Sequence, residues 1–306
     1  VPALGALIAE PLFLIVDAAL VGHLGVTPLA GLGIASAVLQ TIVGLMVFLA
    51  YSTTPAVARK FGAGDPRGAV SVGIDGTWLA LALGVVLAVV GAFAAPGLVS
   101  LFGAAPEVAA VASIYLSISM AGLPAMLVVF AATGLLRGLQ NTITPLWVAG
   151  IGFAANALLN WLFIFGFGWG IAGSALGTVV AQWGMVLVYV VVIGRIARQH
   201  HAPLRPHRAG LRGSARSGGW LFLRTVSLRV AMLLTIVVAT ALGTEELAGY
   251  QVVFTIFSTA AFALDALAIA AQALIGKSLG AGDLPAVRFV LRRTLQWGAL
   301  FGLVVG

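Results

Sequence analysis

The sequence contains no cysteine and few charged residues, and both shortages narrow the class of protein it can encode. Without cysteine it has no disulfide bonds and no thiol chemistry. Charged residues make up 8% of the 306 residues, 61% are hydrophobic, and the mean hydropathy is +1.12. Soluble domains carry about 25% charged residues. A soluble globular fold is therefore excluded, and a polytopic membrane protein is indicated.

Long apolar runs recur along the whole chain. A helix that crosses a bilayer needs about 20 apolar residues. Such runs must be helical, because hydrocarbon cannot satisfy the unpaired backbone groups of a strand. We predict an all-α polytopic membrane protein with eight spans and the beginning of a ninth near Phe289. The eight runs cover residues 2–22, 31–58, 70–95, 108–135, 143–166, 171–194, 220–242 and 247–275.

Basic residues are missing from every second connection between these runs. All 16 Lys and Arg residues lie on the other connections or within a few turns of them. This is the positive-inside asymmetry, so we expect a multi-pass protein of the cell's inner (plasma) membrane with its basic loops in the cytoplasm. The same distribution argues against a nucleic-acid-binding surface, despite a pI near 10.8. The loops without Lys or Arg are residues 23–28, 96–107, 167–170 and 243–246.

Two stretches of the sequence repeat at one offset of 218 residues. Residues 24–31 contain the dipeptide Leu-Gly and then the tripeptide Leu-Ala-Gly, and both recur in residues 242–249. The sequence Gly-Ala-Gly-Asp of residues 62–65 recurs in residues 280–283. A shared offset indicates duplication. Both Gly-Ala-Gly-Asp loops lie on the basic side, so the copies run parallel, as in one class of secondary transporters.

The duplication predicts two parallel six-helix bundles related by pseudo-two-fold symmetry. We expect an N-terminal lobe in residues 1–194, a basic cytoplasmic linker in residues 195–218 and the start of a C-terminal lobe in residues 219–306. The second copy covers only 88 residues and the chain begins at Val1 rather than Met. We therefore expect the chain to be part of a longer protein and to be inactive alone.

The Gly-Ala-Gly-Asp loops have a structural explanation. Their glycines permit positive backbone angles in a tight turn, and each aspartate can cap the following helix. The residues concerned are Gly62, Gly64, Asp65, Gly280, Gly282 and Asp283.

Few ionisable residues lie within the spans, and each is a functional candidate because a charge in lipid costs several kcal/mol. Glu10 and Asp17 lie seven residues apart on one face of the first span, with Pro11 between them. The alternative for Glu10 is that it only shapes a bend at the proline. Asp75 lies near the start of the third span, where we interpret it as interfacial, and Asp265 lies near the middle of the eighth.

Polar residues of two other spans can join Asp17. Asn156 and Asn160 share a face of the fifth span, and Thr178 lies in the sixth. We predict a polar pocket in which Asp17, with Glu10 as its neighbouring acid, loads and releases a proton. The alternative is a hydrogen-bonded helix–helix cluster without a transport role, which Asn and Thr commonly form in membranes.

At these residues the sequence resembles the multidrug and toxic compound extrusion (MATE) transporters, and their DinF-like branch in particular. The resemblance implies a twelve-helix antiporter of two lobes that expels amphipathic, often cationic compounds in exchange for protons or sodium. The motifs that carry it are Glu10-Pro11 with Asp17, residues 21–25, 59–65, 137–142, 156–160 and 173–178, and residues 264–272.

The resemblance also implies roles for individual residues. Asp17 matches the leading coupling acid of the N-terminal lobe, and Asn156, Asn160 and Thr178 match the positions around it in archaeal relatives. Asn160 departs from an aspartate there, which makes a two-carboxylate sodium site less favourable and concentrates coupling on Asp17. Asp265 is then the main visible acid of the C-terminal lobe.

Two other functions compete with drug efflux. A lipid-linked precursor flippase would line its cavity with several cationic residues, whereas most Arg and Lys here lie in loops. An intramembrane enzyme would need clustered catalytic groups, and all four histidines lie in loops. We therefore predict no enzyme, no metal site and no cofactor.

Substrates are expected to be small amphipathic or cationic molecules, held by aromatic walls through burial and cation–π contacts. Most aromatics in a helix bundle are ordinary packing, and no sequence rule separates the two roles. The expected partners are the lipid bilayer and the substrate, with the protein acting as a monomer. The candidate substrate residues are Phe13, Phe48, Trp161, Phe163 and Phe257.

Overall fold

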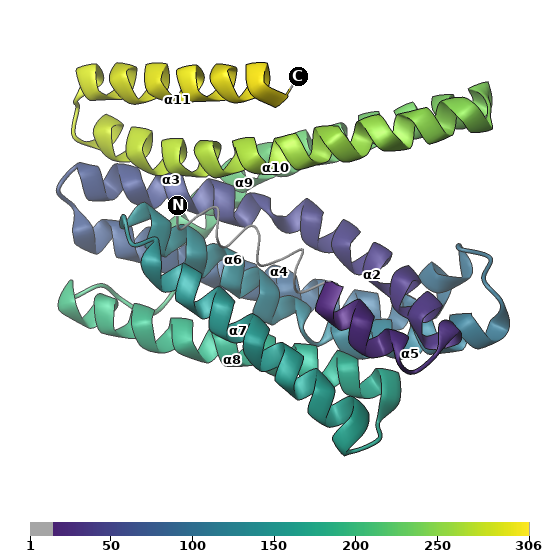
Figure 1. The fold of residues 1–306 in the computed structure, drawn as a ribbon. Helices are drawn as coiled ribbons and strands as arrows, with labels where there is room; N and C mark the ends of the chain where they lie inside the picture. Colours follow the sequence, from purple (N-terminus) through teal and green to yellow (C-terminus); the bar gives the residue numbers. More distant parts are fainter. Residues whose placement is uncertain (1–14, 306) are drawn as a thin grey trace.

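The computed structural model describes residues 15–305, and every regular element in that range is a helix (Figure 1). Glu10 and Phe13 lie outside the described residues. Residues 15–22 belong to the first helix. The others are α2 (Val26–Met46), α3 (Phe48–Gly62), α4 (Pro66–Ser100), α5 (Pro106–Met120), α6 (Leu123–Gly138), α7 (Ile143–Trp161) with the π-helix η1 (Leu162–Gly166), α8 (Gly170–Gln199), α9 (Arg208–Leu242), α10 (Thr244–Gly280) and α11 (Leu284–Val305).

The prediction of an all-helical, multi-spanning membrane protein is confirmed. Within residues 15–305, six helical segments are long and apolar enough to cross a membrane, or seven if α5 and α6 form one bent span. The first predicted span lies mostly outside the described residues. The ninth begins in α11, which is absent from the candidate spans of the described part because Arg288, Arg292 and Arg293 interrupt its apolar run.

Two of the spans are not continuous helices. The second predicted span consists of α2 and α3, which break at Val47. The fourth consists of α5 and α6, which meet at an angle of 48°. Pro124 lies in the first turn of α6 and has no backbone N–H to continue the ladder of α5, which explains the break.

Small residues let the helices approach closely, as is usual in membranes. Along α4, a Cβ on Gly84 would lie 2.5 Å from the Cα of Pro124 in α6, and a Cβ on Gly73 would overlap Leu135. At the end without basic loops, α2, α4, α5 and α8 share one core cluster. At the other end, which we call the basic end, α4, α6, α7 and α8 share a second. In Figure 1, α7 and α8 lie at one edge of the bundle and α11 lies beyond α10 at the other.

The two Gly-Ala-Gly-Asp loops have the same hydrogen-bonded geometry. Asp65 Oδ1 accepts the backbone N–H of Gly68 at 2.7 Å, and Asp283 Oδ1 accepts that of Ala286 at 2.9 Å. The predicted capping role of both aspartates is confirmed, and the repeat extends to individual hydrogen bonds.

The predicted role of the glycines is only half right. Gly64 and Gly282 have φ of 75° and 74°, as expected of the turn. Gly62 and Gly280 are instead the last residues of α3 and α10 and have no positive φ. Their small size serves a contact between these two helices, described below.

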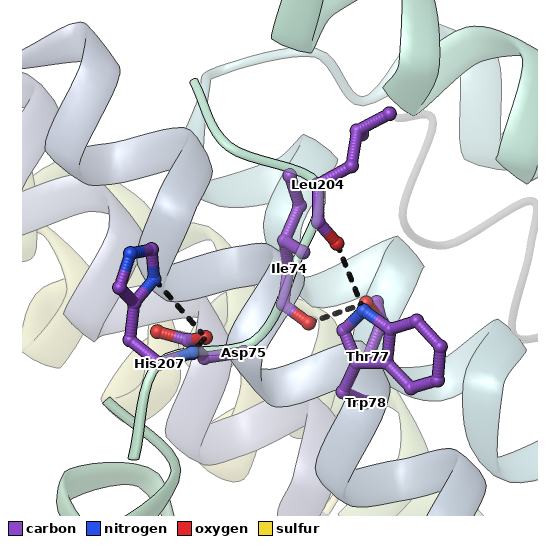
Figure 2. Close-up of polar contacts among 6 residues, drawn as sticks. All are labelled: Ile74, Asp75, Thr77, Trp78, Leu204 and His207. Atoms are coloured by element: carbon purple, nitrogen blue, oxygen red, sulfur yellow. Dashed lines mark hydrogen bonds and ion pairs between the residues drawn. The ribbon is translucent and has the colours of Figure 1, made fainter. Parts of the chain in front are cut away.

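The connection between α8 and α9 is anchored to α4 by Asp75 (Figure 2). Asp75 is only 2% exposed, and its Oδ1 accepts the backbone N–H of His207 at 2.8 Å, with the imidazole Nδ1 at 4.0 Å. One turn away, Trp78 Nε1 donates to the carbonyl oxygen of Leu204 at 3.0 Å. The sequence places Asp75 at the membrane interface near the start of the third span. The structure adds that the connection covers this residue from water and uses its carboxylate to start α9.

Candidate functional site

Asp17 is a buried carboxylate in the first helix, with 5% of its surface exposed. Its Oδ1 accepts hydrogen bonds from Asn160 Nδ2 and Ser174 Oγ, both at 2.8 Å. Its Oδ2 accepts one from the Tyr115 hydroxyl at 3.3 Å. Three helices, α5, α7 and α8, therefore aim neutral donors at one carboxylate.

A second layer extends this network along α7 and α8. Asn160 Nδ2 lies 3.3 Å from Asn156 Oδ1, and Asn156 Nδ2 donates to Thr178 Oγ1 at 2.9 Å. The structure thus brings together the four residues Asp17, Asn156, Asn160 and Thr178, while their role in coupling stays a prediction. We call them, with Tyr115 and Ser174, the Asp17 cluster.

The local sequence explains how the cluster forms. Asn156 and Asn160 lie four residues apart on one face of α7. Gly177 of α8 faces that side, and a Cβ there would overlap Asn160 Oδ1. Gly173 likewise lets the backbone of α8 meet the backbone at Phe163. Two glycines one turn apart therefore set the approach of α7 and α8 that closes the network.

Two members of the cluster were missed by sequence reasoning. Ser174 lies four residues before Thr178, so the spacing that joined Asn156 and Asn160 could have found it. Tyr115 shares α5 with Ser113, Ser117 and Ser119, so hydroxyl groups occur on opposite faces of that helix and none of them indicates which way Tyr115 faces.

The charge of Asp17 has no cationic partner in the cluster. Within residues 15–305 no Lys, Arg or His side chain forms an ion pair or hydrogen bond with it. An ionised carboxylate removed from water is costly unless a cation or several hydrogen bonds compensate it. The described part of the chain contains no group of three or more His, Cys, Asp or Glu residues that could hold a metal ion.

The cluster can accommodate a protonated or an ionised Asp17. The hydroxyls of Tyr115 and Ser174 donate to the carboxylate in this structure and can rotate to accept from a carboxylic acid. Asn160 cannot reverse its role without turning its amide, and its Oδ1 is buried without a partner among the described residues.

Asp265, the candidate acid of the second copy, lies away from this cluster. It is half-buried on α10 and accepts a hydrogen bond from the Tyr51 hydroxyl of α3. Arg137 lies within electrostatic range of both groups, and Arg224 within range of Tyr51. Asp265 therefore belongs to a contact between the two copies rather than to a pocket inside one of them.

The described aromatic candidates are scattered. Phe48 is 6% exposed in a core cluster of α3, α4 and α6. Phe163 packs against two other aromatic rings beyond the end of α7. Trp161 and Phe257 are 53% and 56% exposed. These four rings make no ring contact with one another within the described residues, and their role in substrate binding stays a prediction.

Comparison with known proteins places this arrangement in context. The model of a family described as MatE matches residues 2–162 and 222–306. Protein DETOXIFICATION 44, chloroplastic, of Arabidopsis thaliana is 32% identical in an alignment 315 positions long, which covers 98% of this chain and 60% of that protein. DNA damage-inducible protein F of Escherichia coli strain K12 is 27% identical over 282 residues, 90% of this chain and 61% of that protein.

The fold has a close counterpart among solved structures. A crystal structure of MATE in complex with MaD3S superposes with a TM-score of 0.86 at 24% identity, covering 99% of this chain and 70% of that one. At that identity the likeness shows the fold. The chain spans about 60% of the length of the two relatives described above.

Proposed function

Because this chain belongs to the MatE family of multi-pass membrane transporters, we propose that the protein containing it is a proton-coupled antiporter that exports amphipathic cations. The resemblance to MATE transporters and to the DinF-like branch is confirmed, and the family consists of transporters rather than enzymes. The coupling ion, the substrate and the residues that handle them are the parts we propose.

The Asp17 cluster carries the proposal. An acid that is 5% exposed and surrounded by neutral donors gains most from binding a small cation when water is excluded. Uptake of that cation removes the charge and lets the hydroxyl groups of Tyr115 and Ser174 reverse. Such a change alters the packing of the first helix against α7 and α8, which is what coupling to a conformational change requires.

The orientation of Asn160 favours a proton over sodium. Its Nδ2 faces Asp17 at 2.8 Å, so a metal ion beside the carboxylate would meet an N–H donor instead of an oxygen ligand. A proton on Asp17 needs no such ligand. Replacement of the second family aspartate by Asn160 also removes the negative charge that a sodium ion would use.

The distribution of positive charge favours cationic substrates. No Lys or Arg occurs in residues 1–58 or 68–136, which supply most of the N-terminal lobe. These residues themselves carry no group that would repel a cation or hold a lipid-linked phosphate. The basic groups that reach the lobe are few, among them Arg137 of α6 and Arg229 of α9, which lies against Gly44 of α2. This supports efflux over the flippase, and the basic loops support a plasma-membrane protein with those loops in the cytoplasm.

The proposal is tested by reconstituting the transporter that contains this chain into proteoliposomes. Movement of a fluorescent amphipathic cation is followed under an imposed pH gradient and, separately, under an imposed sodium gradient. We expect the pH gradient to drive transport and Asp17→Asn to abolish it, because the amide neither binds nor releases a proton in this range.

Asp65→Asn is the matched control. It makes the same chemical change at a helix cap, where Asn serves as well as Asp, so transport should persist. Undiminished transport by Asp17→Asn would remove Asp17 from the mechanism. Transport driven by the sodium gradient alone would show that the coupling ion is sodium.

A further inference from the structure

At the basic end, the backbones of α3 and α10 touch through their terminal glycines. A Cβ on Gly62 would overlap the carbonyl oxygen of Lys277, and a Cβ on Gly280 would overlap that of Arg59. Both pairs obey the offset of 218 residues, since Gly62 corresponds to Gly280 and Arg59 to Lys277. The contact is therefore reciprocal, as two equivalent surfaces meeting on a two-fold axis must be.

The same contact continues along both helices toward the membrane interior. A Cβ on Gly276 would lie 3.0 Å from the Cβ of Ala58 and 3.2 Å from the carbonyl oxygen of Pro55. Gln140, which follows α6, donates through Nε2 to the carbonyl oxygen of Ala273 at 3.2 Å. Small side chains and backbone atoms thus form most of the contact between α3 and α10, so few large side chains interdigitate there.

A polar interaction lies further along, at Tyr51 and Asp265. The Tyr51 hydroxyl of α3 donates to Asp265 Oδ2 of α10. Asp265 lies 15 residues before the end of α10, which corresponds to about 22 Å along the helix. Arg137 from α6 lies within electrostatic range of both Tyr51 and Asp265, and Arg224 from α9 lies within range of Tyr51.

The polar interaction is not duplicated, although the glycine contact is. The residues that correspond to Tyr51 and Asp265 through the repeat are Ile269 and Val47, neither of which can form a hydrogen bond through its side chain. The glycine contact is therefore symmetric, whereas the Tyr51–Asp265 hydrogen bond occurs at one of its two equivalent positions only.

Alternating access between parallel halves implies a closed contact on one side of the membrane, and α3 and α10 form such a contact at the basic end through Gly62 and Gly280; we call it the gate. We infer that the Tyr51–Asp265 hydrogen bond is a latch that holds this gate closed. The inference deepens the proposed function, because alternating access between parallel halves requires this contact to separate in the opposite state. Small residues and backbone form most of the closed contact, so the hydrogen bonds of Tyr51 with Asp265 and of Gln140 with Ala273 supply its directional polar contacts.

The first test is a disulfide across the gate in the transporter that contains this chain. Ala58→Cys with Gly276→Cys places two Cβ atoms 3.0 Å apart, close to the 3.5–4.5 Å that a disulfide needs after a small shift. A protease site inserted in residues 200–207 lets the bond be scored as two fragments that stay joined until reduced. We expect rapid oxidation that blocks transport, reversal by reductant, and neither effect in the single variants.

The second test measures the latch without using transport. Ala58 is fully buried, so labelling of Ala58→Cys by a membrane-impermeant maleimide from the basic side reports the open fraction. Tyr51→Phe removes only the hydroxyl, and we expect about 5–30-fold faster labelling, corresponding to loss of one hydrogen bond to a carboxyl group. Ala132→Cys, equally buried in the core cluster of the basic end, controls for general loosening and should be unaffected.

The outcomes separate the gate from the transport proposal. Transport that continues with the disulfide formed would overturn the gate, and unchanged labelling in Tyr51→Phe would overturn the latch. If the parent protein transports no cation under either gradient, the proposed function fails, while the labelling rates still decide whether α3 and α10 open and close.

Discussion

Asp75 gives the most direct structural test, because one carboxylate ties the connection between the two copies to α4 (Figure 2). Asp75→Ala removes the acceptor of the His207 N–H at the first turn of α9. Gly210 lies directly against this carboxylate, so no other side chain is available to replace it. The backbone N–H would then be left without its partner.

The size of the effect follows from two estimates of the same interaction. Loss of a helix cap costs about 0.5–2 kcal/mol, and loss of a hydrogen bond to a charged group costs about 1.5–3 kcal/mol. We expect Asp75→Ala to cost about 1–2 kcal/mol of the free energy that holds the connection on α4. The fraction of molecules in which the connection is detached from α4 then rises about 5–30-fold. Asp75→Asn keeps an acceptor oxygen and should cost only a few tenths of a kcal/mol.

Limited trypsin digestion measures that fraction. Arg208 and Arg212 lie just after the connection, and cleavage follows the population of the opened segment when opening is fast. Asp75→Ala should be cut there about 5–30-fold faster than the parent. His207→Ala keeps the backbone N–H and loses only a half-exposed imidazole, so its rate should stay close to that of the parent.

Two results would refute this reasoning. Equal cleavage of the parent and Asp75→Ala would show that the carboxylate does not hold the connection. Equal acceleration by Asp75→Asn and Asp75→Ala would show that its charge, rather than its hydrogen-bond acceptor, is the stabilising feature.

Two further predictions concern helix packing. Gly177→Ala should impair transport by displacing Asn160 from Asp17 although it removes no polar group, whereas Gly184→Ala on the same helix meets nothing within 4 Å and should be silent in the proteoliposome assay. Gly84→Ala should lower the free energy of unfolding in detergent by about 1–3 kcal/mol relative to Gly97→Ala. The reason is that a Cβ on Gly84 would lie 2.5 Å from the Cα of Pro124, whereas a Cβ on Gly97 meets nothing within 4 Å. Equal behaviour within either pair would contradict the packing described.

Much of the Asp17 cluster could be predicted from spacing along single helices. Asn156 and Asn160 share a face because a helix repeats every 3.6 residues. A polar face of a membrane helix points into the bundle, because exposing its polar groups to lipid is costly. The same reasoning applies to Ser174 and Thr178. It could not identify Tyr115, because the hydroxyl groups of Ser113, Tyr115, Ser117 and Ser119 lie on opposite faces of α5 and do not mark one of them as the inner face.

The contact between the two copies was beyond prediction for a related reason. Gly62 and Gly280 were identified with the correct repeat but assigned to a turn, since local sequence cannot say that another helix lies against them. Asp265 was identified as an unusual charge, yet its partner Tyr51 lies 214 residues away on α3. The candidate aromatic residues show the same limit, because burial of Phe48 and exposure of Phe257 depend on the rotation of each helix.

The sequence by itself determined that this is a multi-spanning helical protein with two parallel copies. Hydrocarbon forces apolar segments to satisfy their own backbone, basic loops mark one side, and a constant offset records the duplication. Only the tertiary structure decided which polar groups meet Asp17, that Asp75 caps α9, and that paired glycines bring α3 and α10 together. Those facts depend on how helices rotate and approach one another, which is set by packing across the bundle and leaves no periodic signal in any one helix.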